Sequence, residues 1–190
     1  MYITSQALNV IEEKFGCPRE MHLSQEIGAG EMKIVRASRR RSRSHDVTLF
    51  IFNAEGNLAV VRKPFYPSGA FRAPSGGVRP GEDFEAGAKR EALEETGLEI
   101  EILHYVLKVS AHFISHGHEE PWTSYVLIAR ATGGELRPID TEEIEDAKWV
   151  SPEDLQTCIR QTLLGTGWGL FQYRVNLTDE TMRLIFEGAS

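Results

Sequence analysis

The alternation of apolar and polar residues is strongest in the middle of the chain, where it predicts strands. Residues 45–53 and 58–62 are rich in branched and aromatic side chains, and the Glu-Gly pair between them predicts a hairpin. Further strands are expected at residues 100–110, 123–131 and 147–150. Because helices are interspersed with these strands, the pattern predicts an α/β domain in which helices are layered on a mixed sheet.

Helical spacing of apolar residues marks both ends of the chain and one central segment. Residues 3–15 show it first. Residues 83–96 predict a helix that ends at Gly97, where a left-handed cap is favoured. Two more helices are expected to begin at Ser151 and Thr178, and a proline follows Ser151, as is typical of a first helical position.

The first 44 residues are interpreted as an N-terminal extension to a domain that spans residues 45–190. A helix and a short strand around residues 32–37 are expected in it. The first 45 residues carry 8 Lys and Arg against 5 Asp and Glu, whereas the whole chain has a formal net charge of −7. An acidic body disfavours non-specific binding of nucleic acid, so no nucleic-acid partner is expected.

Five arginines lie between Arg36 and Arg43. The favoured interpretation is a solvated edge strand with Arg39, Arg41 and Arg43 on one face and Arg40 on the other, because arginine-rich edges resist aggregation. Contact with a phosphate or substrate is one alternative, and RNA binding is another. A β-capable stretch in the extension also predicts a homodimer formed through it.

The composition, with 41% hydrophobic and 26% charged residues, is that of a folded chain. No stretch approaches the roughly 18 consecutive apolar residues that a membrane span needs, so no membrane partner is expected. Glu12, Glu13 and Lys14 interrupt the N-terminal apolar pattern, which argues against a secretory signal. Cys17 and Cys158 form no disulfide framework, and a cytoplasmic location is expected.

The helix expected at residues 83–96 concentrates carboxylates near its C-terminal end. At about 100° per residue, Glu91, Glu94 and Glu95 lie within an arc of about 100°. Like charges at this spacing repel by roughly 0.2–0.5 kcal/mol per pair, and this end of the helix dipole disfavours anions. A hard divalent cation would offset the repulsion because it prefers carboxylate oxygens. Arg90 is the cation of the helix that reaches Glu94 at the i,i+4 position.

The spacing of glycines and charged residues through this region resembles the Nudix box. The matching positions are Gly76, Glu82, Arg90, Glu91, Glu94, Glu95, Gly97 and Leu98. Two positions depart slightly, since Ala92 is smaller than the usual aliphatic residue and Ser75 stands where many members have glycine. A chance match of so many fixed positions is negligible.

This resemblance implies a Nudix-type α/β/α sandwich around a mixed sheet. It also implies hydrolysis of a nucleoside diphosphate linked to another group, with Mg²⁺ or Mn²⁺ as the cofactor. Glu91, Glu94 and Glu95 would bind the metal ion, the Gly76 carbonyl would add a ligand, and Arg90 would orient a glutamate. Such cations neutralise diphosphate oxygens and lower the pKa of a bound water.

The general base is not identified by the box, because family members draw it either from the box or from a downstream glutamate. Glu135, after a Gly-Gly turn, and Glu143, in an acidic loop, are equally favoured. Glu94 or Glu95 could serve instead.

The substrate is expected to be a small nucleotide, with ADP-sugars as the first guess. Basic and aromatic residues near the box are expected to contact it, namely Arg62, Phe71, Arg72 and Trp122. The alternative is a protein of the same fold that senses a nucleotide derivative without hydrolysing it. The three glutamates argue against a sensor, because a pure binder need not keep their mutual repulsion.

Overall fold

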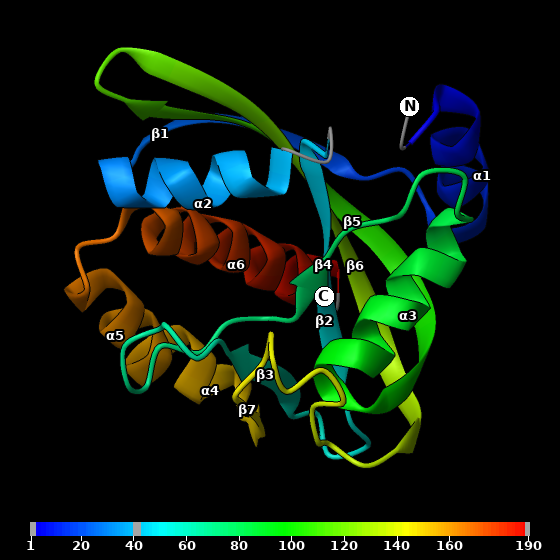
Figure 1. The fold of residues 1–190 in the computed structure, drawn as a ribbon. Coiled ribbons are helices and arrows are strands. Elements are labelled where there is room, and N and C mark those ends of the chain that lie inside the picture. Colours follow the sequence, from blue (N-terminus) through cyan, green and yellow to red (C-terminus); the bar gives the residue numbers. More distant parts are fainter. Residues whose placement is uncertain (1–2, 40–42, 189–190) are drawn as a thin grey trace.

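A seven-stranded sheet organises residues 3–39 and 43–188, the part of the chain described in this computed structural model (Figure 1). The strands are β1 Arg19–Glu26, β2 His45–Phe52, β3 Leu58–Arg62, β4 Ser75–Gly76, β5 Leu98–Ser115, β6 His118–Gly134 and β7 Asp146–Val150. Their order is β1-β5-β6-β2-β3-β7, and β4 pairs with β2. β1 is parallel to β5 and β2 is parallel to β6, whereas the other pairs are antiparallel. The predicted mixed sheet is confirmed.

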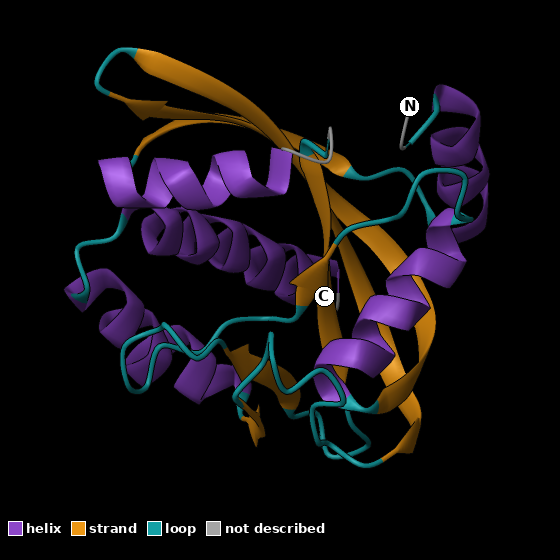
Figure 2. Cartoon of the chain, viewed as in Figure 1, coloured by secondary structure: helices purple, strands orange, loops and turns teal. Residues whose placement is uncertain are grey.

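Helices cover both faces of this sheet, which confirms the expected α/β/α sandwich (Figure 2). They are α1 Ser5–Phe15, α2 Ala29–Arg39, α3 Phe84–Thr96, α4 Pro152–Asp154, the π-helical turn η1 Leu155–Ile159, α5 Arg160–Gly165 and α6 Gly169–Gly188. α1 and α3 pack on one face, and α2, η1, α5 and α6 pack on the other. None of the helices formed by the described residues is long and apolar enough to cross a membrane.

The two-residue period of β2 separates the two hydrophobic cores. Val47, Leu49 and Ile51 pack with residues of α1 and α3, whereas Phe50 packs with residues of α2 and α6. All four side chains are fully buried. Burial of a side chain of this size stabilises a fold by roughly 1.5–3 kcal/mol, so both helical layers are held firmly to the same strand.

β5 and β6 are longer than the sequence predicted and form one hairpin that turns at Gly117. The register of β5 against β6 shifts at three places, the last between Tyr105 and Leu107. Across this shift the buried side chains change face: Tyr105 packs in the core of α1 and α3, and Leu107 packs in the core of α2 and α6. Bulges increase the local twist of a strand, and here they let one hairpin contribute to both cores.

The N-terminal segment differs from the expected helix and short strand. Residues 32–37 lie inside α2, because Met32 and Val35 are three residues apart and are buried together on one helical face. The unpredicted strand β1 pairs in parallel with β5 at the edge of the sheet, and none of its residues is fully buried. Its polar sequence gives no alternation strong enough to predict a strand.

The arginines expected on an edge strand are placed differently by the structure. Arg36 and Arg39 lie on α2 and both form ion pairs with Glu120 of β6. Arg40 and Arg41 fall outside the described residues. These ion pairs fix α2 against the long hairpin.

The C-terminal helix begins at Gly169, earlier than the predicted start at Thr178. This start requires a glycine, since a Cβ at Gly169 would lie 2.0 Å from the Glu26 carbonyl oxygen at the end of β1. Glu31 joins the same region, because its carboxylate accepts hydrogen bonds from the Gly28 and Leu170 amides, each at 2.7 Å. The starts of α2 and α6 are thereby held together.

Gly97, which caps the C-terminal end of α3, is expected to tolerate substitution poorly. Its φ is +73°, and a Cβ there would lie 2.4 Å from the Arg137 carbonyl oxygen. A left-handed conformation costs an L-residue about 1–2 kcal/mol, and crowding adds about 1–3 kcal/mol. Gly97→Ala should therefore lose roughly 2–5 kcal/mol in urea unfolding. Gly56→Ala is the matched control, because φ is +80° and nothing lies within 4 Å of its Cβ position; equal losses would contradict the crowding.

Candidate active site

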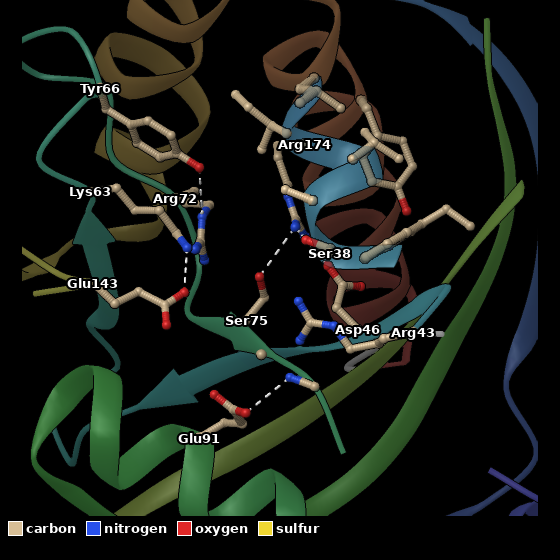
Figure 3. Close-up of a pocket in the computed structure, with 18 of the residues that line it drawn as sticks. Ser38, Arg43, Asp46, Lys63, Tyr66, Arg72, Ser75, Glu91, Glu143 and Arg174 are labelled. Atoms are coloured by element: carbon tan, nitrogen blue, oxygen red, sulfur yellow. Dashed lines mark hydrogen bonds and ion pairs between the residues drawn. The ribbon is translucent and has the colours of Figure 1, made fainter. Parts of the chain in front are cut away.

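A cavity of about 810 Å³ opens where α3, the loop after β3, α2 and α6 meet (Figure 3). Its size is in the range of roughly 300–1,000 Å³ that small-molecule sites occupy. The loop from Ser75 to Pro80 and the carboxylates Glu91 and Glu94 form one side of it. Residues of α2 and α6, which are far apart in the sequence, form another side.

The local sequence fixes how α3 presents its side chains to this cavity. Asp83 caps the start of the helix by accepting a hydrogen bond from the Ala86 amide at 2.9 Å. Gly97 ends it in the left-handed conformation that the sequence predicted. Gly76 then lies so close to the helix that a Cβ would stand 1.8 Å from Glu91 Oε2. Only glycine permits this approach of the loop backbone to the carboxylate.

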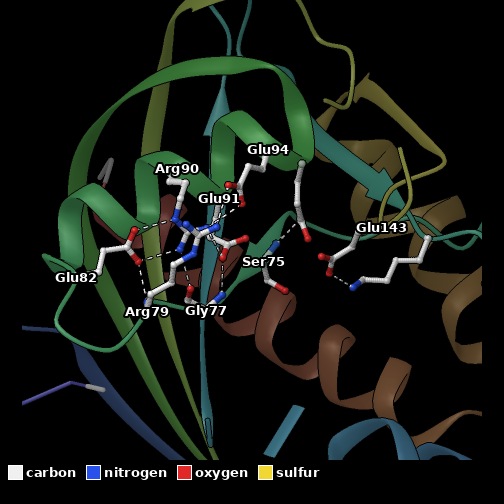
Figure 4. A network of polar contacts seen from close by, with 10 residues as sticks. Ser75, Gly77, Arg79, Glu82, Arg90, Glu91, Glu94 and Glu143 are labelled. Carbon is white, nitrogen blue, oxygen red and sulfur yellow. Dashed lines mark hydrogen bonds and ion pairs between the residues drawn. The ribbon is translucent and has the colours of Figure 1, made fainter. Parts of the chain in front are cut away.

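Arg90 is the centre of the polar contacts on α3 (Figure 4). Its Nε and Nη2 donate to the two carboxylate oxygens of Glu82 at 2.8 and 2.9 Å. Nη2 also donates to the Gly77 carbonyl at 2.9 Å. Nη1 donates to Glu91 and Glu94, both at 2.8 Å. One guanidinium thus contacts three carboxylates and offsets one of their three negative charges.

Glu95 is the most buried of the three predicted metal ligands, with 2% of the residue exposed. Its Oε2 accepts a hydrogen bond from the Ser75 amide at 2.8 Å. Its Oε1 lies 3.5 Å from Arg72 Nη2 and accepts no hydrogen bond from the described residues. Burial raises the pKa of Glu95, although the charge of Arg72 opposes the shift. Burial also raises the pKa of Glu91, against the hydrogen bond from Arg90.

The chemistry of these donors fits a hard divalent cation, since Glu91, Glu94 and Glu95 supply the carboxylate oxygens that such ions prefer. Both hydrogen bonds to Glu91 from the described residues fall on Oε1, and Glu95 Oε1 has none. Among residues 3–39 and 43–188, however, no three acidic, His or Cys side chains converge closely enough to hold a metal ion. Arg90 keeps Glu91 and Glu94 in their positions, so both side chains would have to turn to bind one.

The two candidates for the general base occupy different places. Glu143 lines the cavity, and its Oε1 accepts a hydrogen bond from Lys63 Nζ at 2.5 Å. Burial raises the pKa of Glu143, but the charge and hydrogen bond of Lys63 outweigh it, and the pKa is lowered overall. Glu135 is exposed after β6 and is not among the described residues that line the cavity. The structure therefore brings Glu143, and not Glu135, to the carboxylates of α3.

Of the four residues predicted to contact the substrate, two line the cavity and two do not. Arg72 and Trp122 line the cavity. Arg62 instead forms an ion pair with Glu145 at 2.8 Å, and Phe71 is 5% exposed in the core. Neither Arg62 nor Phe71 is among the cavity-lining side chains of the described part of the chain.

A buried polar network beside the cavity was not predicted. Asp46 of β2 accepts hydrogen bonds from Arg174 at 2.7 Å and from Ser124, whose hydroxyl oxygen accepts one from Tyr173 at 2.7 Å. Burial raises the pKa of Asp46, but the charge and hydrogen bonds of its partners lower it overall. Arg174 also donates to the Ser75 hydroxyl at 3.2 Å. Local sequence patterns could not identify this network, because it joins residues from both ends of the chain.

Aromatic side chains form the side of the cavity opposite α3. Trp168 and Phe171 of α6 stack with ring centroids 5.1 Å apart, and Tyr66 meets Phe171 edge-on at 4.8 Å. Phe65, in the loop after β3, is 53% exposed and lines the same region. The cavity therefore has a charged end and an aromatic end.

Comparison with known families decides the classification. The model of one family, described as NUDIX domain, matches residues 43–165. The chain belongs to the Nudix family. The family that the box resembles is thereby confirmed, and the matched segment includes the whole of the box and α3. α2 and α6 lie outside the matched segment.

Several curated relatives of this Nudix chain resemble it over about half its length. It is 36% identical to the NAD-capped RNA hydrolase NudC of Chromobacterium violaceum over 92 residues, which cover 48% of this chain and 32% of the relative. It is 30% identical to the mitochondrial NAD(P)H pyrophosphatase NUDT13 of Homo sapiens over 108 residues, or 54% of this chain and 28% of that protein. The chain thus matches about a third of the length of these relatives.

One solved structure that the chain matches in part is a binary complex of a C. elegans Ap4A hydrolase. The sequence identity is 21% and the TM-score is 0.47, with coverage of 65% of this chain and 90% of that chain.

We expect Glu82 to stabilise the Nudix fold in a pH-dependent way. The hydrogen bonds from Arg90 hold its pKa at about 2, below its ordinary value of 4.5. A lowered pKa contributes stability above the ordinary value, and this stability is lost as the pH falls from about 4.5 toward 2. Glu82→Gln should lose roughly 1–3 kcal/mol in urea unfolding at pH 7 and progressively less as the pH approaches 2.

The control for this measurement is Glu55→Gln, in the exposed turn between β2 and β3, which should change stability by less than about 0.5 kcal/mol at either pH. A deficit of Glu82→Gln that is the same at pH 7 and pH 2.5 would contradict the assigned ionisation of Glu82.

Proposed function

We propose that this protein is a metal-dependent hydrolase that cleaves the diphosphate linkage of a nucleoside diphosphate derivative. The observation that carries the proposal is the placement of the Nudix carboxylates at one end of a cavity whose other end is aromatic. With a divalent cation bound, the carboxylates suit a diphosphate, and an aromatic end suits a planar base. The cavity volume is also sufficient for a nucleotide.

Glu91, Glu94 and Glu95 would hold the metal ion, with the Gly76 carbonyl as a further ligand. Once bound, a Mg²⁺ or Mn²⁺ ion would supply neutralisation of the phosphate oxygens and a lowered pKa for water. Arg90 would keep two of these carboxylates on the cavity side of α3, because it binds both at 2.8 Å. The Ser75 amide would orient Glu95 in the same way.

Glu143 is proposed as the general base. A base must be unprotonated and must reach the attacking water. The lowered pKa of Glu143 keeps its carboxylate ionised at neutral pH, and the side chain faces the same cavity as Glu91 and Glu94. Lys63 orients it by donating to Oε1, so Oε2 is left to accept the proton.

The substrate class is proposed to include dinucleotides such as NADH as well as ADP-sugars. Relatives named NAD-capped RNA hydrolase and NAD(P)H pyrophosphatase suggest the first group. The aromatic end of the cavity supports it, since a second planar ring could stack against Trp168 or Phe65. A small-molecule nucleotide partner, a homodimer and a cytoplasmic location remain predictions.

Hydrolysis should require both the metal ion and the carboxylates of α3. We expect phosphate-containing products from at least one of NADH, ADP-ribose and dinucleoside polyphosphates in Mg²⁺, and none in EDTA. Glu94→Gln should lower kcat by at least about 100-fold, because it removes several kcal/mol of charge stabilisation. Glu85→Gln is the matched control on the same helix, since Glu85 pairs with Lys14 and Lys89 away from the cavity.

A nucleotide sensor of the same fold is the alternative outcome of this assay. It would bind one of the compounds, measured by calorimetry, and release no product with or without metal. Turnover that persists in Glu94→Gln would contradict the assigned role of α3.

Substituting each of the two candidate general bases in turn should show which one acts in hydrolysis. Glu143→Gln is expected to lower kcat by about 10²–10⁴-fold with little change in KM, because it removes proton transfer and keeps the shape of the site. Glu135→Gln should stay within about two-fold of the wild type in both constants. A larger loss in Glu135→Gln than in Glu143→Gln would reverse the assignment.

A further inference from the structure

Most cations that line the cavity already have an acidic partner. The ion pairs, at 2.5–3.5 Å, are Arg72–Glu95, Lys63–Glu143, Arg79–Glu94, Arg90–Glu82 and Arg174–Asp46. Arg43 also lines the cavity. It forms no ion pair and donates no hydrogen bond within residues 3–39 and 43–188, and the remaining residues of the chain contain no Asp or Glu. Asp46 and Glu143 feel its charge, but neither forms an ion pair with it among the described residues, because each is already paired with another cation.

Arg43 is nonetheless held in a defined position. Its guanidinium carbon lies 5.9 Å from the ring centroid of Trp122, on the face of a side chain that is 8% exposed. A cation over an indole ring is stabilised electrostatically, and the flat guanidinium suits the contact better than an ammonium group. Figure 3 shows Arg43 directed into the cavity between Glu91 and Asp46.

Gly77 gives Arg43 the room to occupy this position. A Cβ at Gly77 would lie 2.1 Å from Arg43 Nη1 and 2.4 Å from its Cδ, so the arginine crosses directly over the loop backbone. The Gly77 amide donates to Glu91 at 3.0 Å. The guanidinium therefore stands beside a proposed metal ligand and on the cavity side of the loop.

We propose that Arg43 is the diphosphate-binding residue of this cavity, and that its guanidinium donates hydrogen bonds to phosphate oxygens of the substrate on the side away from α3. The inference rests on the proposed function, because it assigns a ligand group within the same site. Arginine suits this role, since its planar fork donates two parallel hydrogen bonds to a phosphate. The other cavity cations are less suited, because their carboxylate partners would have to be displaced.

Binding can be measured separately from hydrolysis with two probes that this site cannot cleave. α,β-Methylene-ADP carries a diphosphate-like group and a base, and methylenediphosphonate carries the former alone. We expect Arg43→Gln to weaken binding of both probes by about 10- to 100-fold in calorimetry with Mg²⁺, as the loss of hydrogen bonds to a charged group predicts. Arg43→Lys keeps the charge but loses the planar guanidinium, so its affinity for the probes should lie between those of the wild type and Arg43→Gln.

Arg36→Gln is the matched control. Arg36 belongs to the same arginine-rich segment, but it is paired with Glu120 of β6 and does not line the cavity. It should bind both probes as the wild type does. Thermal unfolding of each variant checks that Arg43→Gln remains folded. If it is unfolded, Arg43→Lys is compared with the wild type instead, and a salt titration of wild-type binding measures the electrostatic contribution.

The outcomes separate this inference from the proposed function. Equal affinity of Arg43→Gln and the wild type for both probes would overturn the role of Arg43, whatever the protein hydrolyses. In a second outcome, the wild type binds methylenediphosphonate but not the nucleotide probe, and Arg43→Gln weakens that binding. The role of Arg43 would then be supported, and the assignment of a nucleotide substrate would be wrong. A wild type that binds neither probe would contradict both.

Discussion

Several acidic side chains of α3 and the loop before it share one guanidinium, and the geometry of the candidate active site depends on this sharing. Arg90 binds Glu82, Glu91 and Glu94, and its fourth partner is the Gly77 carbonyl. Hydrogen bonds to charged groups are worth about 1.5–3 kcal/mol each, which exceeds the few tenths by which like charges repel along a helix. The same contacts bring the loop backbone against the helix, so the carboxylates and the loop lie on one surface.

The part of the fold governed by local rules was predictable from the sequence. The cap of α3 at Gly97, the β2–β3 hairpin and the residues of the box follow from short-range spacing, and each is where the pattern placed it. β1 was missed because its alternation rests on only two apolar residues, Met21 and Leu23, which are partly buried at the edge of the sheet. Part of α2 was misread as a strand because its adjacent β-branched residues Ile34 and Val35 favour a strand, and only Met32 and Val35 mark its buried helical face.

The candidate site likewise has a part that the sequence predicted and a part that it could not predict. Its carboxylates lie within one helix, so their relation could be derived from helical geometry alone. The choice between Glu143 and Glu135 depends on how a loop returns to the sheet, and the network of Asp46 depends on a helix that begins more than a hundred residues later. No local signal carries such information. Arg62 and Phe71 show the converse, because proximity to the box in sequence did not place them in the cavity.

The cavity is closed by segments from both ends of the chain, held together where Glu31 binds the Leu170 amide and where Arg174 binds Asp46. This arrangement has a consequence for synthesis, because domains form as the chain emerges from its N-terminal end. The carboxylates of α3 are available long before α6 exists. The segment that supplies the carboxylates is thus synthesised well before the segment that encloses the cavity, and the cavity can form only once α6 has been made.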